Sequence, residues 1–462
     1  MKNKKLSIII RIIVIIIFSI LLLIFQNYHE PWADEAQSFL IARDTNLIEM
    51  FKYMKYEGTP PLWVIIIKIF IKLGGTYSTF SLVPIFFSIL GVIVFEFKIK
   101  APIYIKILFP FTYFIFCQYT IIARSYCLIF LALMIIASIY PKRFEKLLEF
   151  TLSLIFLMLI STHSYIIAGS LYLLFLIDLF KNGKILEKKF FIYTIILFTS
   201  FFIVLIISLP VVDCYYGVRA QESFSYIIAS STLASSRNNI INIIITIIVI
   251  SSVFISIKKE NILELLIVFL PLLFFLRFFH CIDWHIGIVT YLIVFYLIIS
   301  DLINEKRIIK IFLVIMCIIQ IIWTVYFLIY DVNYAYSAGE KTAQFIIDNN
   351  LENKRIYGLG YNVTAIQPYF EKNIFESQYP KDKSFWNWSR KTSPYFLSTE
   401  EIINADADVY IISDFYELKY KDVIEYLDNS SNYKKTYIYG VSFMKTYLHE
   451  SGSYYIYIKN TY

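Results

Sequence analysis

The amino-acid sequence predicts a polytopic α-helical membrane protein, with about 11 transmembrane helices and one interfacial helix, followed by an extracytoplasmic α/β domain. Of its 462 residues 58% are hydrophobic and only 17% are charged, whereas soluble proteins carry about a quarter charged residues. The charges are also unevenly distributed. Residues 1–330 hold 46 of the 77 Asp, Glu, Lys and Arg, and residues 331–462 hold the other 31. We therefore expect a transmembrane domain over 1–330 and a soluble domain over 331–462.

Eleven apolar segments of the first part approach the length of about 20 residues that crosses a bilayer. They cover residues 6–26, 77–97, 103–118, 121–140, 147–162, 164–180, 190–210, 240–257, 262–279, 286–301 and 308–330. The first follows a basic start and has no small-residue cleavage site after it, so we interpret it as an uncleaved span. A further segment, 62–73, is short and carries Lys68 and Lys72. It fits either a twelfth span or an interfacial helix.

The distribution of basic residues decides between these two topologies. If the N-terminus is cytoplasmic and 62–73 does not cross, 19 of the 28 basic residues of 1–330 face the cytoplasm, including every tight cluster. If segment 62–73 crossed the membrane as well, every later cluster of basic residues would lie on the external side. We therefore expect an integral plasma-membrane protein with a cytoplasmic N-terminus, a first external loop at 27–76 and an extracellular C-terminal domain.

Polar residues gather on the external side in this topology. Nine of the 18 acidic residues of 1–330 and all four of its histidines lie there. Charges at the mouth of a membrane bundle indicate a functional site, because they are costly unless used or paired. The basic residues lie in short clusters between apolar runs, which argues against a nucleic-acid partner.

The first external loop carries two distinctive runs. In Glu-Pro-Trp-Ala-Asp-Glu-Ala-Gln, residues 30–37, Pro31 suits a helix start, and Asp34 with Glu35 complements the helix dipole. These acids therefore have a structural interpretation beside a functional one. In Tyr-Glu-Gly-Thr-Pro-Pro-Leu-Trp, residues 56–63, Glu57 precedes a rigid turn into the short helix.

These motifs resemble those of the GT-C glycosyltransferases, the polytopic relatives of protein O-mannosyltransferases and aminoarabinose transferases. The Trp-x-Asp-Glu-Ala and Pro-Pro-Leu-aromatic runs of the first loop are similar to theirs. So are Ala-Arg-Ser-Tyr at 123–126, Thr-His-Ser-Tyr at 162–165 and the His-x-Gly run at 285–287. The resemblance implies an inverting enzyme that moves a sugar from a polyprenyl-phosphate donor to an acceptor glycan, lipid or protein at the external face of the lipid bilayer.

Such a displacement requires a base, an aligned pair of reactants and positive charge for the leaving phosphate. Asp34 is the expected base, from its position and from the resemblance. Glu35 points about 100° away on a helix, so we expect a separate catalytic role for it or a pairing with a neighbouring cation. The two are the expected catalytic residues.

Residues at the outer helix ends are expected to bind the donor. Arginine suits bidentate contact with phosphate. The expected substrate-binding residues are Arg124, Tyr126, His163 and Arg277, and Arg219 lies in an external loop. A divalent metal ion is the alternative source of positive charge, with Glu57 and His285 as its ligands and His163 as a third choice. Snorkelling at the interface is the structural alternative for each arginine.

The tail after residue 330 alternates helices and strands. Helices are expected at 338–349, 363–370 and 421–427, and strands at 355–359, 408–413, 436–439 and 454–458. Trp386 and Trp388 lie in a loop whose residue types stack on sugars or form an ordinary aromatic surface. Two other function classes remain open: a transporter or flippase of lipid-linked sugars, and a glycan ligase or polymerase. A transporter is expected to show internal repeats, and none is evident in the sequence.

Overall fold

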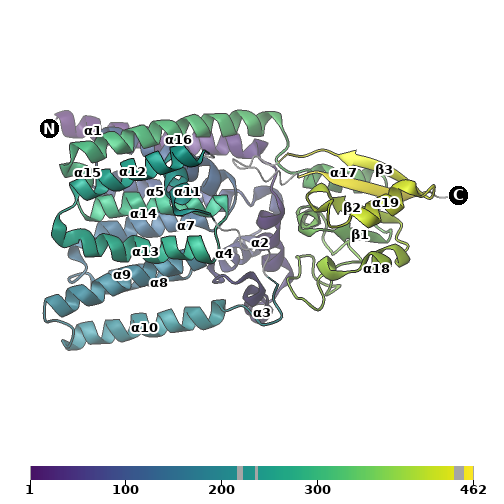
Figure 1. The fold of residues 1–462 in the computed structure, drawn as a ribbon, viewed down its shortest axis with the longest axis horizontal. Helices are drawn as coiled ribbons and strands as arrows, with labels where there is room; N and C mark the ends of the chain where they lie inside the picture. The colour runs from purple at the N-terminus through teal and green to yellow at the C-terminus, as the bar shows by residue number, and fades with distance from the viewer. Residues whose placement is uncertain (1, 216–221, 235–237, 442–451, 461–462) are drawn as a thin grey trace. The chain divides into compact units, whose positions relative to one another are not determined.

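The computed structural model describes residues 2–215, 222–234, 238–441 and 452–460 (Figure 1). Contacts divide the chain into two compact units. Unit 1 comprises residues 1–24, 81–209 and 217–328, and unit 2 comprises residues 25–80, 210–216 and 329–462. The first external loop therefore belongs to the same compact unit as the tail, whereas the sequence-based division places the whole of 1–330 in one domain.

Unit 1 is a bundle of helices (Figure 1). They are α1 (Lys2–Phe25), α5 (Leu82–Lys98), α6 (Ile103–Leu108), α7 (Tyr126–Ile139), α8 (Leu147–Met158), α9 (Thr162–Lys181), α10 (Lys188–Ser208), α11 (Phe224–Leu233), α12 (Asn239–Ser256), α13 (Ile262–Phe278), α14 (Asp283–Ile299), α15 (Leu302–Glu305) and α16 (Arg307–Asn333). Helix α14 packs on α7, α11 and α13, and α9 packs on α8 and α13. Helix α14 is buried along most of its length and forms the centre of the bundle.

In the described part of the chain, six helices are long and apolar enough to cross a membrane. They span Lys5–Tyr28, Tyr77–Lys98, Thr162–Lys181, Lys188–Ser208, Asn239–Ser256 and Arg307–Asn333. Their exposed side chains are mostly Ile, Leu and Phe, as expected of a surface that faces lipid. The chain is thus a helical protein with membrane-crossing segments.

The expected span 103–118 is not one helix. It is divided into α6, a short turn at Phe109–Phe111 and a π-helical segment at Phe114–Ile121. Pro110 explains the break, because proline lacks the amide hydrogen that continues a helix and clashes with the preceding turn.

The expected loop 211–239 contains a helix that the sequence analysis missed. Helix α11 is only ten residues long, too short to register as a span. The Gln320 amide donates to the carbonyls of Ser231 and Thr232 at 3.2 and 3.3 Å, and the Thr290 hydroxyl donates to Ser231. Polar side chains of α14 and α16 therefore satisfy the end of a helix that stops inside the bundle.

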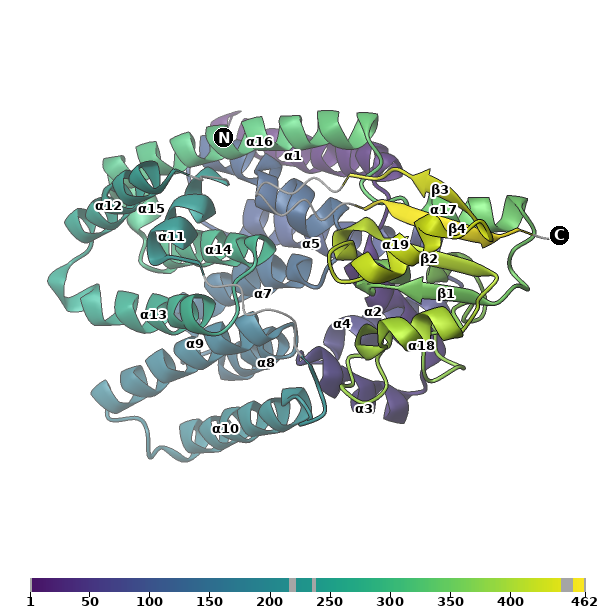
Figure 2. The ribbon, with the colours of Figure 1, turned by 45° about the vertical axis from the view of Figure 1, so that its right-hand side comes forward.

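Unit 2 combines three helices of the first loop with a four-stranded sheet. The helices are α2 (Ala33–Asp44), α3 (Leu47–Glu57) and α4 (Leu62–Lys72), and the tail adds α17 (Gly339–Asp348), α18 (Thr399–Asn404) and α19 (Lys421–Asn429). The strands are β1 (Ile356–Leu359), β2 (Val409–Ser413), β3 (Tyr433–Ile438) and β4 (Tyr454–Lys459). Their order is β1-β2-β4-β3, with β1 and β2 parallel and the other pairs antiparallel (Figure 2).

Helices cover both faces of this sheet. Val409 and Ile411 of β2 point into one core, with Ala343 and Ile346 of α17. The alternate residues Tyr410 and Ile412 point into the other core, with residues of α18 and α19. This alternation is the two-residue period of a strand that is buried on both faces.

One expected helix of the tail, 363–370, is wrong. The chain forms two short 3₁₀ turns there, Tyr361–Ala365 and Gln367–Tyr369. Pro368 lies in the second turn, and a proline disfavours helical geometry at the residue before it.

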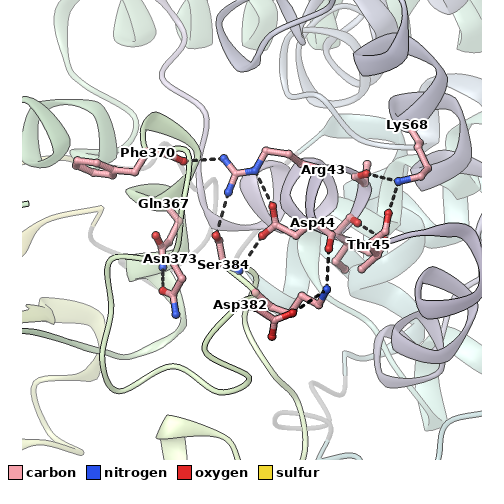
Figure 3. A network of polar contacts seen from close by, with 12 residues as sticks. Arg43, Asp44, Thr45, Lys68, Gln367, Phe370, Asn373, Asp382 and Ser384 are labelled. Carbon is pink, nitrogen blue, oxygen red and sulfur yellow. Dashed lines mark hydrogen bonds and ion pairs between the residues drawn. The ribbon is translucent and has the colours of Figure 1, made fainter.

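The end of α2 is held by polar contacts with the tail (Figure 3). The Arg43 guanidinium donates to a carboxylate oxygen of Asp44 at 2.7 Å, to the carbonyl of Phe370 at 2.8 Å and to the hydroxyl of Ser384 at 2.9 Å. The other Asp44 oxygen accepts from the Ser384 amide at 2.8 Å. These bonds hold the C-terminal end of α2 against residues 370–384.

Lys68 closes the same helix end from α4. Its ammonium donates to the carbonyls of Ala42, at 2.8 Å, and Thr45. Positive charge at a helix C-terminus is favourable, because the last carbonyls are unpaired and carry partial negative charge. The lysine that interrupts the apolar pattern of 62–73 is therefore used to dock α4 on α2 (Figure 3).

Candidate functional site

The first turn of α2 presents two adjacent acids in different surroundings. The helix begins shortly after Pro31, and the Glu35 carboxylate accepts from the amide of the N-cap residue Trp32 at 3.1 Å. Asp34 is half-buried, whereas Glu35 is only 1% exposed. Each acid therefore requires a separate description.

Glu35 belongs to a buried group of charges that we call the ion-pair cluster: His29, Glu35 and Asp331. The His29 Nε2 lies 3.2 Å from Glu35 Oε2, and its Nδ1 lies 3.4 Å from Asp331 Oδ1. Burial favours the neutral ring, but the charges of Asp331 and Glu35 together outweigh it and raise the pKa of His29 from 6.5 to about 10. At neutral pH the imidazolium is held between two carboxylates, so Glu35 pairs with a cation.

Asp34 belongs to a second group that we call the carboxylate cluster: Asp34, Gln37, Glu57, Tyr361 and Trp388. The Tyr361 hydroxyl donates to Asp34 Oδ1 at 2.7 Å. Glu57 Oε1 accepts from the Gln37 amide at 2.7 Å and from the Trp388 indole at 3.1 Å. The rings of Tyr361 and Trp388 lie 4.8 Å apart, so the donors of the two carboxylates pack against each other.

Backbone contacts of the tail fix this cluster. Gln37 donates to the Trp386 carbonyl at 2.9 Å and accepts from its amide at 2.7 Å, which pairs its side chain with the tail backbone. The amide of Tyr215 donates to the Trp388 carbonyl at 3.0 Å, and the Tyr215 ring lies 5.5 Å from that of Trp388. Segments from three parts of the chain thus surround the cluster.

Of the two interpretations of the aromatic loop at 379–395, sugar stacking does not fit Trp386. Its side chain is 2% exposed, and its indole donates to the Tyr215 hydroxyl at 3.0 Å. Its hydrophobic ring fills one core of unit 2. Trp388 is half-buried and donates to a carboxylate.

Unit 1 gathers four of the five expected binding and metal residues that lie in it. The ring centroids of His163 and His285 are 4.1 Å apart, and those of Tyr126 and His285 are 6.0 Å apart. The Arg124 guanidinium lies 5.5 Å from the centre of the Tyr126 ring. With His280, whose ring is 4.9 Å from that of His285, we call this group the histidine cluster.

The other arginines lie apart from these contacts. Arg277, in the last turn of α13, lies 5.3 Å from the centre of the Phe278 ring, and no described contact joins it to the histidine cluster. Arg219 falls in 216–221, outside the described residues.

The expected metal ligands are engaged with N–H donors. Glu57 Oε1 accepts two of them, as described above. The Nδ1 of His285 accepts from the Ile282 amide at 3.2 Å, so a neutral ring carries its proton on Nε2 and cannot offer that nitrogen to a metal. Among the described residues no group of three or more His, Cys, Asp and Glu is arranged to hold a metal ion.

Sequence reasoning missed the partners of the first-loop acids. His29 and Gln37 lie in the same loop, but Asp331, Tyr361 and Trp388 are about 300 positions away, and no periodic pattern links them. The one available signal was the concentration of aromatic residues at 379–395.

Comparisons with known proteins give no relative from which the function can be transferred. No family model, no curated protein and no solved structure matches the chain.

Proposed function

We propose that the chain is a membrane-embedded, inverting glycosyltransferase of the GT-C type. It transfers a sugar from a polyprenyl-phosphate donor to a hydroxyl of an acceptor glycan, lipid or protein. The observation that carries the proposal is the position of Asp34: it is half-buried in the first turn of α2 and accepts a hydrogen bond from the Tyr361 hydroxyl, while the adjacent Glu35 is buried against His29. The motifs at 32–36, 123–126 and 162–165 support the same function.

Asp34 acts as the general base. Its carboxylate takes the proton of the acceptor hydroxyl while that oxygen forms a bond to the anomeric carbon. The bond from the anomeric carbon to the phosphate oxygen breaks on the opposite side, and polyprenyl phosphate leaves with the electron pair. The configuration at the anomeric carbon is inverted, because a single displacement occurs.

The histidine cluster binds the donor phosphate. Arg124 supplies the permanent charge, and its side chain is held over Tyr126. His163 supplies a buried ring nitrogen, Nε2, that has no hydrogen-bond partner among the described residues. A divalent metal ion with Glu57 and His285 as ligands is the alternative source of positive charge, and both side chains accept N–H donors in this structure. Arg277 is assigned no role in the displacement.

The proposed topology has eleven crossings, a cytoplasmic N-terminus and an external tail in the plasma membrane. Docking of Lys68 on α2 supports an interfacial α4. Single cysteines at Leu186, between α9 and α10, and at Leu418, in the tail, test it, since these side chains are 83% and 91% exposed and all five native cysteines are buried. We expect an impermeant maleimide to label only position 418 in intact cells. Labelling of only position 186 would reverse the topology.

The activity is tested with purified protein in vesicles that contain polyprenyl-phosphate hexoses or pentoses. We expect release of polyprenyl phosphate, and we expect Asp34→Asn to lower the rate about 10²- to 10⁴-fold. The matched control is Asp348→Asn, at an exposed carboxylate at the end of α17, and it should leave the rate unchanged. Movement of the sugar lipid across the membrane without release of polyprenyl phosphate would overturn the proposal in favour of a flippase.

A further inference from the structure

Tyr361 lies at a position where the backbone fixes its direction. It follows Gly360, whose φ of 90° is a conformation that side-chain-bearing residues rarely adopt. A Cβ at Gly360 would lie 2.4 Å from the Tyr416 ring, so the strand β1 turns here at a site that only glycine fits. Tyr361 begins the 3₁₀ turn after this bend.

The ring of Tyr361 is held on two sides. Its centroid lies 4.8 Å from the Trp388 ring and 6.1 Å from the Trp386 ring. The two tryptophans are themselves anchored through Gln37, Glu57 and Tyr215. The phenol is therefore oriented before it meets Asp34, and its hydrogen bond costs little side-chain entropy.

The bond to Asp34 joins the tail to the first loop. The Tyr361 hydroxyl lies 2.7 Å from Asp34 Oδ1, across 327 positions of sequence. A neutral donor on one carboxylate oxygen fixes the rotation of the carboxylate without neutralising its charge. The bond thus favours one orientation of the Asp34 carboxylate.

We propose that Tyr361 is a positioning residue, through which the tail orients the carboxylate of Asp34 for proton abstraction. This inference rests on the proposed function, since it assigns the tail a part in the same reaction. A correctly oriented base accelerates the displacement, whereas a freely rotating one is aligned only part of the time. The effect falls on the chemical step and leaves donor binding unchanged.

The test is Tyr361→Phe, which removes the hydroxyl and keeps the ring between the two tryptophans. We expect kcat to fall about 10-fold or more with an unchanged KM for the polyprenyl-phosphate sugar and an unchanged melting temperature. The matched control is Tyr437→Phe in β3, which also removes a tyrosine–aspartate hydrogen bond, of 3.0 Å to Asp414. It should leave kcat and KM unchanged.

Two outcomes separate failure of this inference from failure of the proposed function. If Asp34→Asn abolishes turnover but Tyr361→Phe keeps the wild-type kcat, or raises KM alone, the positioning role is overturned and the glycosyltransferase stands. If the unmodified protein releases no polyprenyl phosphate, the proposed function fails and this role fails with it. If the unmodified protein is active and Asp34→Asn is equally active, Asp34 is not the base, and the positioning role is overturned while the glycosyltransferase stands. A double variant, Asp34→Asn with Tyr361→Phe, should be no slower than Asp34→Asn alone, because the two residues act as one unit.

Discussion

The ion-pair cluster and the carboxylate cluster begin on adjacent residues of one helical turn, but the carboxylates in them differ in burial and in hydrogen-bond donors. The ion-pair cluster buries Glu35 and Asp331 almost completely and balances them with an imidazolium. The carboxylate cluster leaves Asp34 half-exposed and gives it a neutral hydroxyl. A buried, balanced charge stabilises a fold or specifies its geometry, whereas a partly hydrated charge with a neutral donor remains able to accept a proton.

The sharpest way to break this comparison is to remove the imidazolium. His29→Leu leaves two carboxylates buried without their cation, so we expect the free energy of unfolding to fall by about 3–5 kcal/mol. Asp34→Asn, on the same turn, should lower it by less than about 1 kcal/mol, because the side chain is half-exposed and an amide still accepts from Tyr361. Denaturant titration in detergent measures both. Equal losses in the two variants would mean that the clusters do not differ in role.

The pH dependence of stability gives the second test. Charge pairing raises the pKa of His29 from 6.5 to about 10, so the folded state binds a proton that the unfolded state releases. The stabilisation is fully present below pH 6.5 and is lost as pH rises toward 10. The groups that face His29 are Glu30, Glu35, Asp331 and the Tyr336 ring at 4.7 Å.

We therefore expect the melting temperature of the unmodified protein to decline between pH 7 and pH 10. The decline should be much smaller in His29→Leu, which lacks the titrating group. Melting curves at five pH values across this range provide the measurement. A parallel decline in both proteins would assign the alkaline sensitivity to other groups.

The sequence predicted one of these clusters better than the other. The start of a helix after Pro31 and its acidic first turn were predicted from local signals, namely the proline and the fit of Asp34 and Glu35 to the helix dipole. The pairing of Glu35 with a cation was a stated alternative, but the identity of that cation was not predictable. His29 contacts Asp331 across 302 positions of sequence. The periodicity of hydrophobic residues reports local structure and cannot predict a contact of that separation.

The membrane part shows the same limit. Apolar runs located the six long helices, because length and composition are properties of the run itself. Apolar runs did not predict α11, because this helix is too short for a span and its C-terminal carbonyls are bonded by Gln320 and Thr290 of other helices. The contact between His163 and His285 likewise depends on how α9 and α14 lie in the bundle, and the sequence indicated only that both residues lie on the external side.

A matched pair of tryptophans sharpens the description of the carboxylate cluster. Trp386→Phe and Trp388→Phe each remove an indole donor, to the Tyr215 hydroxyl and to Glu57 respectively. We expect Trp386→Phe to lower the free energy of unfolding by about 2 kcal/mol, because its ring fills a core. Trp388→Phe should cost about 1 kcal/mol of stability and should reduce turnover more than Trp386→Phe does. The reverse order for turnover would place the functional contact at Trp386.

The smallest change in stability is expected for a substitution at the C-terminal end of α2, where Lys68 of α4 donates to backbone carbonyls. Lys68→Met keeps the length of the side chain but removes the bonds to Ala42 and Thr45. We expect a loss of about 1 kcal/mol in the free energy of unfolding, since the ammonium is only half-buried and water can replace it. Lys72→Met, at the end of α4, is the control, and it should change stability by less. If Lys68→Met were neutral, the docking of α4 would rest on its apolar face alone. A measurable loss of stability would show instead that a lysine inside an apolar run anchors α4 on α2. Charge would then be balanced at both ends of α2, by His29 beside the first turn and by Lys68 at the last.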